Sequence, residues 1–191
     1  MKARKVKGLD CEASLADNAE RIVLVRLDEL HRLAPAALDP SQEEALHDMR
    51  IAAKRLRYVL EVTEPALGSA AKRGIGEART LQEVLGEIHD CDVMLATVRA
   101  HAKRLRAEDA AAVRSALAPT AVDVKPEQIA GAPNLANYRG LEALVTYLRV
   151  RRDVLFAAFS EQWAELDREG FRKSLEQAVA ERPDTVEHDS A

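Results

Sequence analysis

Four basic side chains recur along one helical stretch at intervals that align them for contact with an anion. They are His47, Arg50, Lys54 and Arg57. On an α-helix this spacing puts all four on one face, in steps of about 4.5 to 6 Å, which is commensurate with the phosphate repeat of an extended chain. Arginine offers a planar fork of donors that matches phosphate oxygens, and lysine offers a point charge. This basic stripe therefore indicates binding of a linear polyanion, with His47 adding charge at mildly acidic pH.

An apolar stripe runs directly beside the basic stripe. It consists of Leu46, Met49, Ala53, Leu56 and Leu60. Cations at the border of a buried face can line a groove between helices instead of extending into open water. The alternative is that these long side chains flank the apolar face and turn outward to solvent, as they do in many helices.

Other stretches also place a cation on their apolar face. Arg26 lies near the centre of the first such face and Arg152 near the centre of the last. A third face combines Asp92, Arg99 and Lys103 with Leu81, Leu85, Ile88 and Leu95. A buried charge without a partner is costly, so each must meet a carboxylate, water or an anionic ligand. We hypothesise that the cations converge on one polar cavity; the alternative is a buried network of ion pairs with Asp92, Glu61 and Glu29.

The composition and periodicity of the chain are typical of an all-α protein. Hydrophobic residues make up 47% of the sequence and aromatic residues only 4%, which suits helix-on-helix packing better than a β-sheet. Apolar spacing and capping residues predict helices over residues 14–33, 41–64, 75–105, 108–117, 138–166 and 170–180. The predicted interruptions are at Pro35, Pro65, Gly68 and Gly74. We expect two packed helical bundles or hairpins.

The predicted organisation is one helical domain between a flexible basic tail and an acidic tail, over residues 14–182, 1–13 and 183–191 respectively. An internal boundary is predicted near residues 118–138, which hold Pro119, Pro126, Gly131 and Pro133. Since both flanks are helical, this segment either joins two small bundles or connects two long helices.

The overall charge balance does not decide the function. The net charge at pH 7 is only −4, so any anion site must arise from segregated charge. The chain contains no run of about 18 apolar residues, so no membrane span is predicted. Cys11 and Cys91 lack a CxxC spacing and are typical of thiols in a reducing compartment. The expected location is the cytoplasm.

Two motifs carry a resemblance to a known family. His47-Asp-Met-Arg-Ile-Ala-Ala-Lys-Arg-Leu-Arg-Tyr-Val-Leu-Glu61 resembles one signature of the CHAD family, the conserved histidine α-helical domain. Leu81-Gln-Glu-Val-Leu-Gly-Glu-Ile-His-Asp-Cys-Asp-Val93 resembles the other, a leucine-glycine step followed by Asp-x-Asp-Val. The general shape of the match runs from about Ser14 to Leu175.

The resemblance implies two related helical bundles around a basic channel that binds inorganic polyphosphate. It also implies possible partners: a separate polyphosphate-metabolising enzyme, since no CYTH-type triphosphate-hydrolase domain is attached, or a polyhydroxyalkanoate storage granule. By position it assigns the basic stripe with Tyr58 to the first motif, and Gln82, His89 and Asp92 to the second. The chain departs from longer members, which carry the basic motif twice, because its second half has only Arg149, Arg151 and Arg152 without a matching histidine.

An enzyme is the first rival interpretation. The residues to consider as metal ligands are His47, His89, Asp90 and Asp92. Only His89 and Asp92 share a helical face, which makes at most half a site. The sequence has no glycine-rich phosphate loop, nucleophile elbow or zinc motif. We therefore expect no catalysis, no metal and no cofactor.

Two binding functions compete with polyphosphate. Nucleic acid is also a polyanion, but few aromatic side chains are present to stack on bases, and several lie on apolar faces. A helical scaffold, for example at a granule surface, is the alternative of a different class. Its expected mark is a broad exposed apolar stripe.

The predicted polyphosphate contacts are Arg26, His47, Arg50, Lys54, Arg57, Arg99, Lys103 and Arg152. The predicted supporting residues are Tyr58, Gln82, His89 and Asp92, with Asp92 expected to orient Arg50 or Arg57. Gly86 is expected to permit close approach of two helices, with a helix kink as the alternative. Trp163, at helical spacing from Phe156 and Phe159, is expected in the core.

Overall fold

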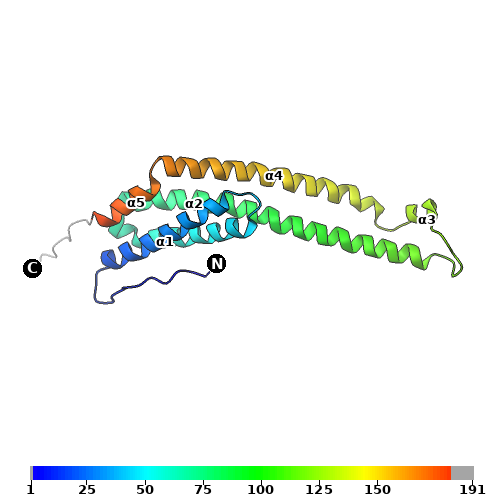
Figure 1. Cartoon of the computed structure of the whole chain (residues 1–191), viewed down its shortest axis with the longest axis horizontal. Helices are drawn as coiled ribbons and strands as arrows, with labels where there is room; N and C mark the ends of the chain where they lie inside the picture. Colours follow the sequence, from blue (N-terminus) through cyan, green and yellow to red (C-terminus); the bar gives the residue numbers. More distant parts are fainter. Residues whose placement is uncertain (1, 182–191) are drawn as a thin grey trace, which may run out of the picture. The chain divides into compact units, whose positions relative to one another are not determined.

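The computed structural model describes residues 2–181, and this part of the chain is all-α, with no strands. Figure 1 shows its five helices, which comprise 81% of it. They are α1 (Leu15–Ala37), α2 (Glu43–Ser115), α3 (Pro126–Ala130), α4 (Leu135–Arg168) and α5 (Phe171–Ala180). The predicted fold class is confirmed. The predicted acidic tail lies outside the described residues.

The first helix begins where its capping residue predicts and ends later than expected. The Ser14 side chain accepts a hydrogen bond from the Asp17 backbone N–H at 3.1 Å, which caps α1. The prediction that this helix ends near Leu33 was wrong, because α1 continues through Pro35 to Ala37. A proline in the last turn removes few backbone hydrogen bonds, and burial of Ala37 in the core favours the extra turn.

Helix α2 consists of two arms that reverse direction at Gly68. This glycine has φ 60° and ψ −134°, outside the helical region. Contacts pair residues symmetrically about it: Lys72 with Glu64, and the His47 ring with the His89 ring. Residues 43–67 therefore form a first arm, antiparallel to the start of a second arm, residues 69–115. The first arm passes through the exposed Pro65 instead of ending at Glu64, and the second is continuous, so no separate helix exists over 108–117.

Gly68→Ala is expected to destabilise the protein by about 1–3 kcal/mol, because a side chain makes a positive φ unfavourable. The cause is conformational, since no atom lies within 4 Å of the position a Cβ would take. Gly76→Ala is the matched control on the same helix: it also has open space but no positive φ, so it is expected to stabilise by about 0.5–1 kcal/mol. Urea denaturation of both variants checks this; equal effects would contradict the assigned role of Gly68.

The chain divides into two compact units, which we describe separately. Unit 1 contains the described residues up to 89 and from 155 onwards. Its core combines α1, the facing parts of both α2 arms, the end of α4, and α5. Phe159 is fully buried, and Trp163 is 7% exposed with its ring 5.0 Å from that of His31. The predicted core position of Trp163 is confirmed.

Unit 2 contains residues 90–154 and is an antiparallel pair formed by the end of α2 and the start of α4. Its buried residues are Cys91, Leu95, Val98, Ala102, Leu105, Asp109 and Leu148. Residues 118–138 lie within this unit, where they connect the two long helices and include the short helix α3.

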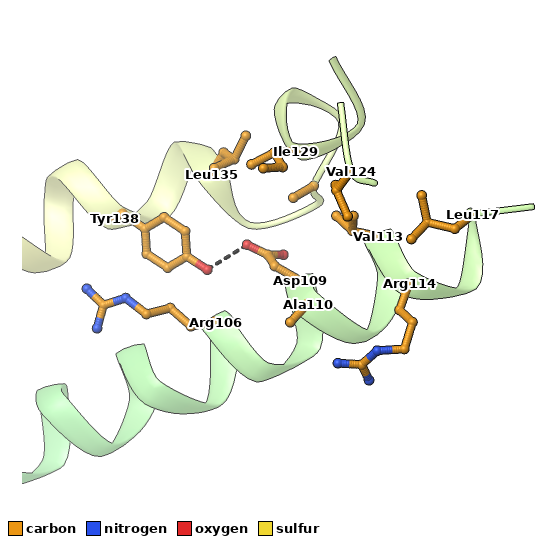
Figure 2. Close-up of a pocket in the computed structure, with 11 residues that line it drawn as sticks. Arg106, Asp109, Ala110, Val113, Arg114, Leu117, Val124, Ile129, Leu135 and Tyr138 are labelled. Carbon is orange, nitrogen blue, oxygen red and sulfur yellow. Dashed lines mark hydrogen bonds between the residues drawn. The ribbon is translucent and has the colours of Figure 1, made fainter. Parts of the chain in front are cut away.

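Asp109 anchors this connection to α2. Its Oδ1 accepts hydrogen bonds from the Asn134 backbone N–H at 3.0 Å and from Asn134 Nδ2 at 2.9 Å. Its Oδ2 accepts one from the Tyr138 hydroxyl at 2.5 Å, the dashed line in Figure 2. Burial raises the pKa of Asp109, but the hydrogen bonds from Tyr138 and Asn134 outweigh it, and the pKa lies below its ordinary value. Asp109 is therefore an ionised structural group at neutral pH.

Candidate functional site

The basic stripe lies on the first arm of α2 and is half-buried along its whole length. The arginine side chain at its end, Arg57, is only 17% exposed. The neighbouring apolar stripe is completely buried, with exposed fractions of 2% or less at Leu46, Met49, Ala53, Leu56 and Leu60. The structure thus places the four cations at the border of the unit 1 core, and not turned out into open water.

The two sequence motifs meet between the arms of α2. The ring centroids of His47 and His89 lie 4.7 Å apart, with planes inclined at 45°. One helical turn away, Arg50 Nε lies 3.5 Å from the position a Gly86 Cβ would occupy. A Cβ at position 86 would be in ordinary contact with Arg50, so the approach of the two arms does not require glycine here, and the role predicted for Gly86 stays a prediction.

Several polar atoms of this cluster are buried without a hydrogen-bond partner on the protein. They are His47 Nδ1, Arg50 Nε, Arg57 Nε and Gln82 Oε1. A buried polar group without a partner destabilises a fold by about 1–3 kcal/mol. Two of these atoms are guanidinium donors on one helix face; Arg57 Nε lies 3.5 Å from Glu61 Oε1 without making a hydrogen bond to it. They are suited to an anion with several acceptor oxygens.

The Tyr58 ring contacts Lys54 and Arg57, the last two cations of the stripe. Arg57 Cζ lies 4.7 Å and Lys54 Nζ 5.7 Å from the centre of its ring, within the range of cation–π attraction. The ring itself is 47% exposed. Tyr58 therefore lies against two cations of the stripe, and the supporting role assigned to it stays a prediction.

Glu61 lies at the end of the stripe and also contacts Arg79, a cation that was not predicted from the sequence. Its Oε1 lies 3.5 Å from Arg57 Nε and 3.8 Å from Arg79 Nη2, so one carboxylate is shared by two guanidinium groups. Arg79 lies on the second arm, directly across from Arg57 about Gly68. To identify Arg79 from the sequence, one would have had to predict that the helix reverses direction at Gly68.

Arg26 is paired within α1. Its Nη1 lies 2.7 Å from Glu29 Oε2, and the exposed fractions of the two side chains are 13% and 1%. The same nitrogen also donates to the Arg4 carbonyl at 3.1 Å. Glu29 is one of the carboxylates that the ion-pair alternative specified, so the charge of Arg26 is already compensated.

The N-terminal segment contacts α1. Arg4 forms an ion pair with Asp28, and its backbone N–H donates to Glu29. Arg21 donates to the Gly8 carbonyl. The segment predicted as a basic tail thus lies against the helix that carries Arg26.

Arg152 and Asp92 form the corresponding pair in unit 2. Arg152 Nε lies 2.5 Å from Asp92 Oδ1, and the side chains are 11% and 12% exposed. The prediction that Asp92 orients Arg50 or Arg57 was wrong: its carboxylate pairs with a residue on α4. The planar carboxylate of Asp92 and the planar guanidinium of Arg152 match each other in geometry. Asp92 thus finds its partner on another helix and not on its own.

Arg99 and Lys103 are exposed, contrary to their predicted place on an apolar face. The buried residues of this part of α2 are Leu95, Val98, Ala102 and Leu105. Arg99 and Lys103 each follow a buried residue by one position, which turns them about 100° away from the core. Arg99 instead lines a small cavity of 160 Å³ together with Arg106, Leu141, Glu142, Val145 and Arg149.

The structure therefore sorts the predicted residues into two groups. Unit 1 brings together His47, Arg50, Lys54, Arg57, Tyr58, Gln82 and His89, with Arg26 paired on α1. Unit 2 holds Asp92, Arg99, Lys103 and Arg152. Over residues 2–181, no cluster of three or more histidine, cysteine or acidic side chains is arranged to hold a metal ion. None of the helices in this range combines the length and apolar character that crossing a membrane requires.

Comparison with known proteins identifies one family. The family model of the CHAD domain matches residues 3–99, just over half of the chain. This match contains α1, both sequence motifs and the start of unit 2, and it ends earlier than the Leu175 limit expected from the resemblance. Neither curated proteins nor solved structures gave a match.

Proposed function

The chain belongs to the CHAD domain family, which is associated with polyphosphate binding, and we propose that it is a non-enzymatic module that binds inorganic polyphosphate. The contacts come from the basic stripe on the first arm of α2. A separate polyphosphate-metabolising enzyme is the partner that this function requires for turnover of the polymer. The proposed location is the cytoplasm.

The observation that carries the proposal is the pair of buried guanidinium nitrogens on one helix face. Arg50 Nε and Arg57 Nε have no hydrogen-bond acceptor on the protein. A polyphosphate chain presents acceptor oxygens on every unit, so a single ligand can satisfy both donors at once. Donors that remain unsatisfied in the protein alone favour ligand binding over a purely structural role.

The local charge supports the same interpretation. Among the described residues, no carboxylate lies within ion-pair distance of Arg50 or Lys54, and Glu61 is shared between Arg57 and Arg79. The stripe therefore keeps an excess of positive charge in a chain whose net charge is −4. This segregation provides an attractive field for a polyanion despite the acidic balance of the whole chain.

The other predicted contacts contribute unequally. Arg26 and Arg152 are each held by a carboxylate, so we assign them a smaller direct contribution. Arg99 and Lys103 are exposed and free to meet phosphates as additional, weaker contacts.

Calorimetric titration with long-chain polyphosphate over a salt series tests the proposal. Binding is expected to weaken as salt rises, with a logarithmic slope of about −2 at neutral pH if Arg50, Lys54 and Arg57 each displace a counterion from a flexible chain. Single-stranded DNA and triphosphate serve as competitors and are expected to displace the polymer poorly. Absence of binding at low salt, or equal competition by DNA, would overturn the assignment.

A helical scaffold remains the second candidate, on a separate observation. Tyr147, Val150 and Val154 lie on one face of α4 in unit 2 and are 56%, 57% and 64% exposed. Exposed apolar side chains in helical register favour packing against another apolar surface, of a protein or a storage granule. If polyphosphate does not bind, loss of self-association or granule binding in Val150→Ser/Val154→Ser would support the scaffold.

A further inference from the structure

A pocket of 460 Å³ opens in unit 2. Figure 2 shows that the end of α2, the connection containing α3, and the start of α4 enclose it. Its apolar lining consists of Ala110, Val113, Leu117, Val124, Ile129, Ala132 and Leu135. Its volume falls in the range of about 300–1,000 Å³ that is typical of small-molecule sites.

The interior of this pocket has no free polar group to offer a ligand. Asp109 is its buried polar residue, 7% exposed, and both of its oxygens already accept hydrogen bonds from Asn134 and Tyr138. A polar group placed there would lose its hydrogen bonds to water without replacement. The part of a ligand that enters the pocket must therefore be apolar.

Two arginines of α2 line the pocket, and their guanidinium groups lie away from its apolar residues (Figure 2). Arg106 is engaged by Glu142, with Nη2 3.2 Å from Oε1, and by the Tyr138 ring at 5.5 Å. Arg114 is exposed and, within the described residues, has no carboxylate in ion-pair range. Figure 2 draws its guanidinium on the side of α2 that faces away from the pocket, so a change of side-chain rotamer brings it to an anionic group at the edge of the pocket.

We propose that this pocket binds an aliphatic carboxylate of medium chain length. The hydrocarbon chain lies among Val113, Ile129 and Leu135, where it is removed from water, and the carboxylate meets the guanidinium of Arg114. The pocket shares no residue with the basic stripe, so this activity is independent of polyphosphate binding and can fail or succeed separately.

The test is an isothermal calorimetric titration of the full chain with decanoate, kept below its micellar concentration. Decanol and decyltrimethylammonium are compared because they keep the chain and change the head group. Saturable one-to-one binding of decanoate is expected, with decanol about threefold to tenfold weaker. Absence of decanoate binding, or a preference for the cationic head group, would overturn the proposal.

Two substitutions, each with a control, test whether decanoate binds in this pocket. Ala110→Trp fills the lining from an exposed helix position and is expected to abolish binding, whereas Ala111→Trp, on the neighbouring position that does not line the pocket, is the matched control. Arg114→Gln is expected to weaken decanoate to the level of decanol, with Arg104→Gln as its control. Equal decanoate affinity in Ala110→Trp and Ala111→Trp would show that the ligand binds elsewhere.

Discussion

The Arg50→Gln/Arg57→Gln double variant is expected to bind polyphosphate at least about 100-fold more weakly than the original chain at moderate salt. Each substitution keeps a polar but shorter side chain and removes a charge and its paired donors. A charge-assisted hydrogen bond contributes about 1.5–3 kcal/mol, and both arginines are partly shielded from solvent. Two such losses on one polymer chain account for the expected decrease.

The same double variant is expected to retain or slightly increase its stability. Both guanidinium nitrogens are buried without a hydrogen-bond acceptor on the protein, and we expect the relief of these unsatisfied donors to outweigh loss of the Arg57–Glu61 ion pair, whose carboxylate is partly exposed. Thermal unfolding followed by circular dichroism checks this alongside the calorimetry. An opposite pattern, with lower stability and unchanged affinity, would mean that these arginines are structural.

Arg73→Gln is the matched control for this experiment. Arg73 is an exposed cation on the second arm of α2 and is not part of the stripe. Its removal changes the net charge by one unit without removing a buried donor. We expect a change in affinity of less than about threefold, since exposed charges act weakly through solvent.

Asp92→Ala is expected to lower the free energy of unfolding by about 2–4 kcal/mol. The substitution removes the Asp92 carboxylate from the Arg152 guanidinium, which is only 11% exposed in the pair. Breaking an enclosed pair from one side is costly because the remaining charge stays poorly solvated. Urea denaturation followed by circular dichroism measures the change.

Two comparisons make this prediction specific. Asp92→Leu/Arg152→Met removes both charges and is expected to recover most of the lost stability. Glu142→Gln breaks the exposed Arg106 pair, whose side chains are 58% and 66% exposed, and is expected to change stability by less than about 1 kcal/mol. If Asp92→Ala keeps full stability but greatly changes polyphosphate affinity, Arg152 is a ligand contact and not a structural one.

The sequence alone determined those features that depend on neighbouring positions in one helix. The spacing of His47, Arg50, Lys54 and Arg57 sets their common face, because the geometry of an α-helix is the same wherever it forms. The same reasoning found the apolar stripe beside them and the cap at Ser14. It also specified Glu29 as a possible partner for Arg26, which lies within one turn of the same helix.

Only the tertiary structure decided which distant groups meet. Several arginines were candidate partners for Asp92 in the sequence. The packing of α2 against α4 places Arg152, sixty positions away, within reach of its carboxylate. The reversal at Gly68 brought Gly86 to Arg50 and Arg79 to Glu61, and a glycine in the sequence indicates a break without indicating its angle. Local spacing follows from covalent geometry, whereas long-range pairing follows from the packing of all the apolar faces together, and that packing is a property of the whole chain.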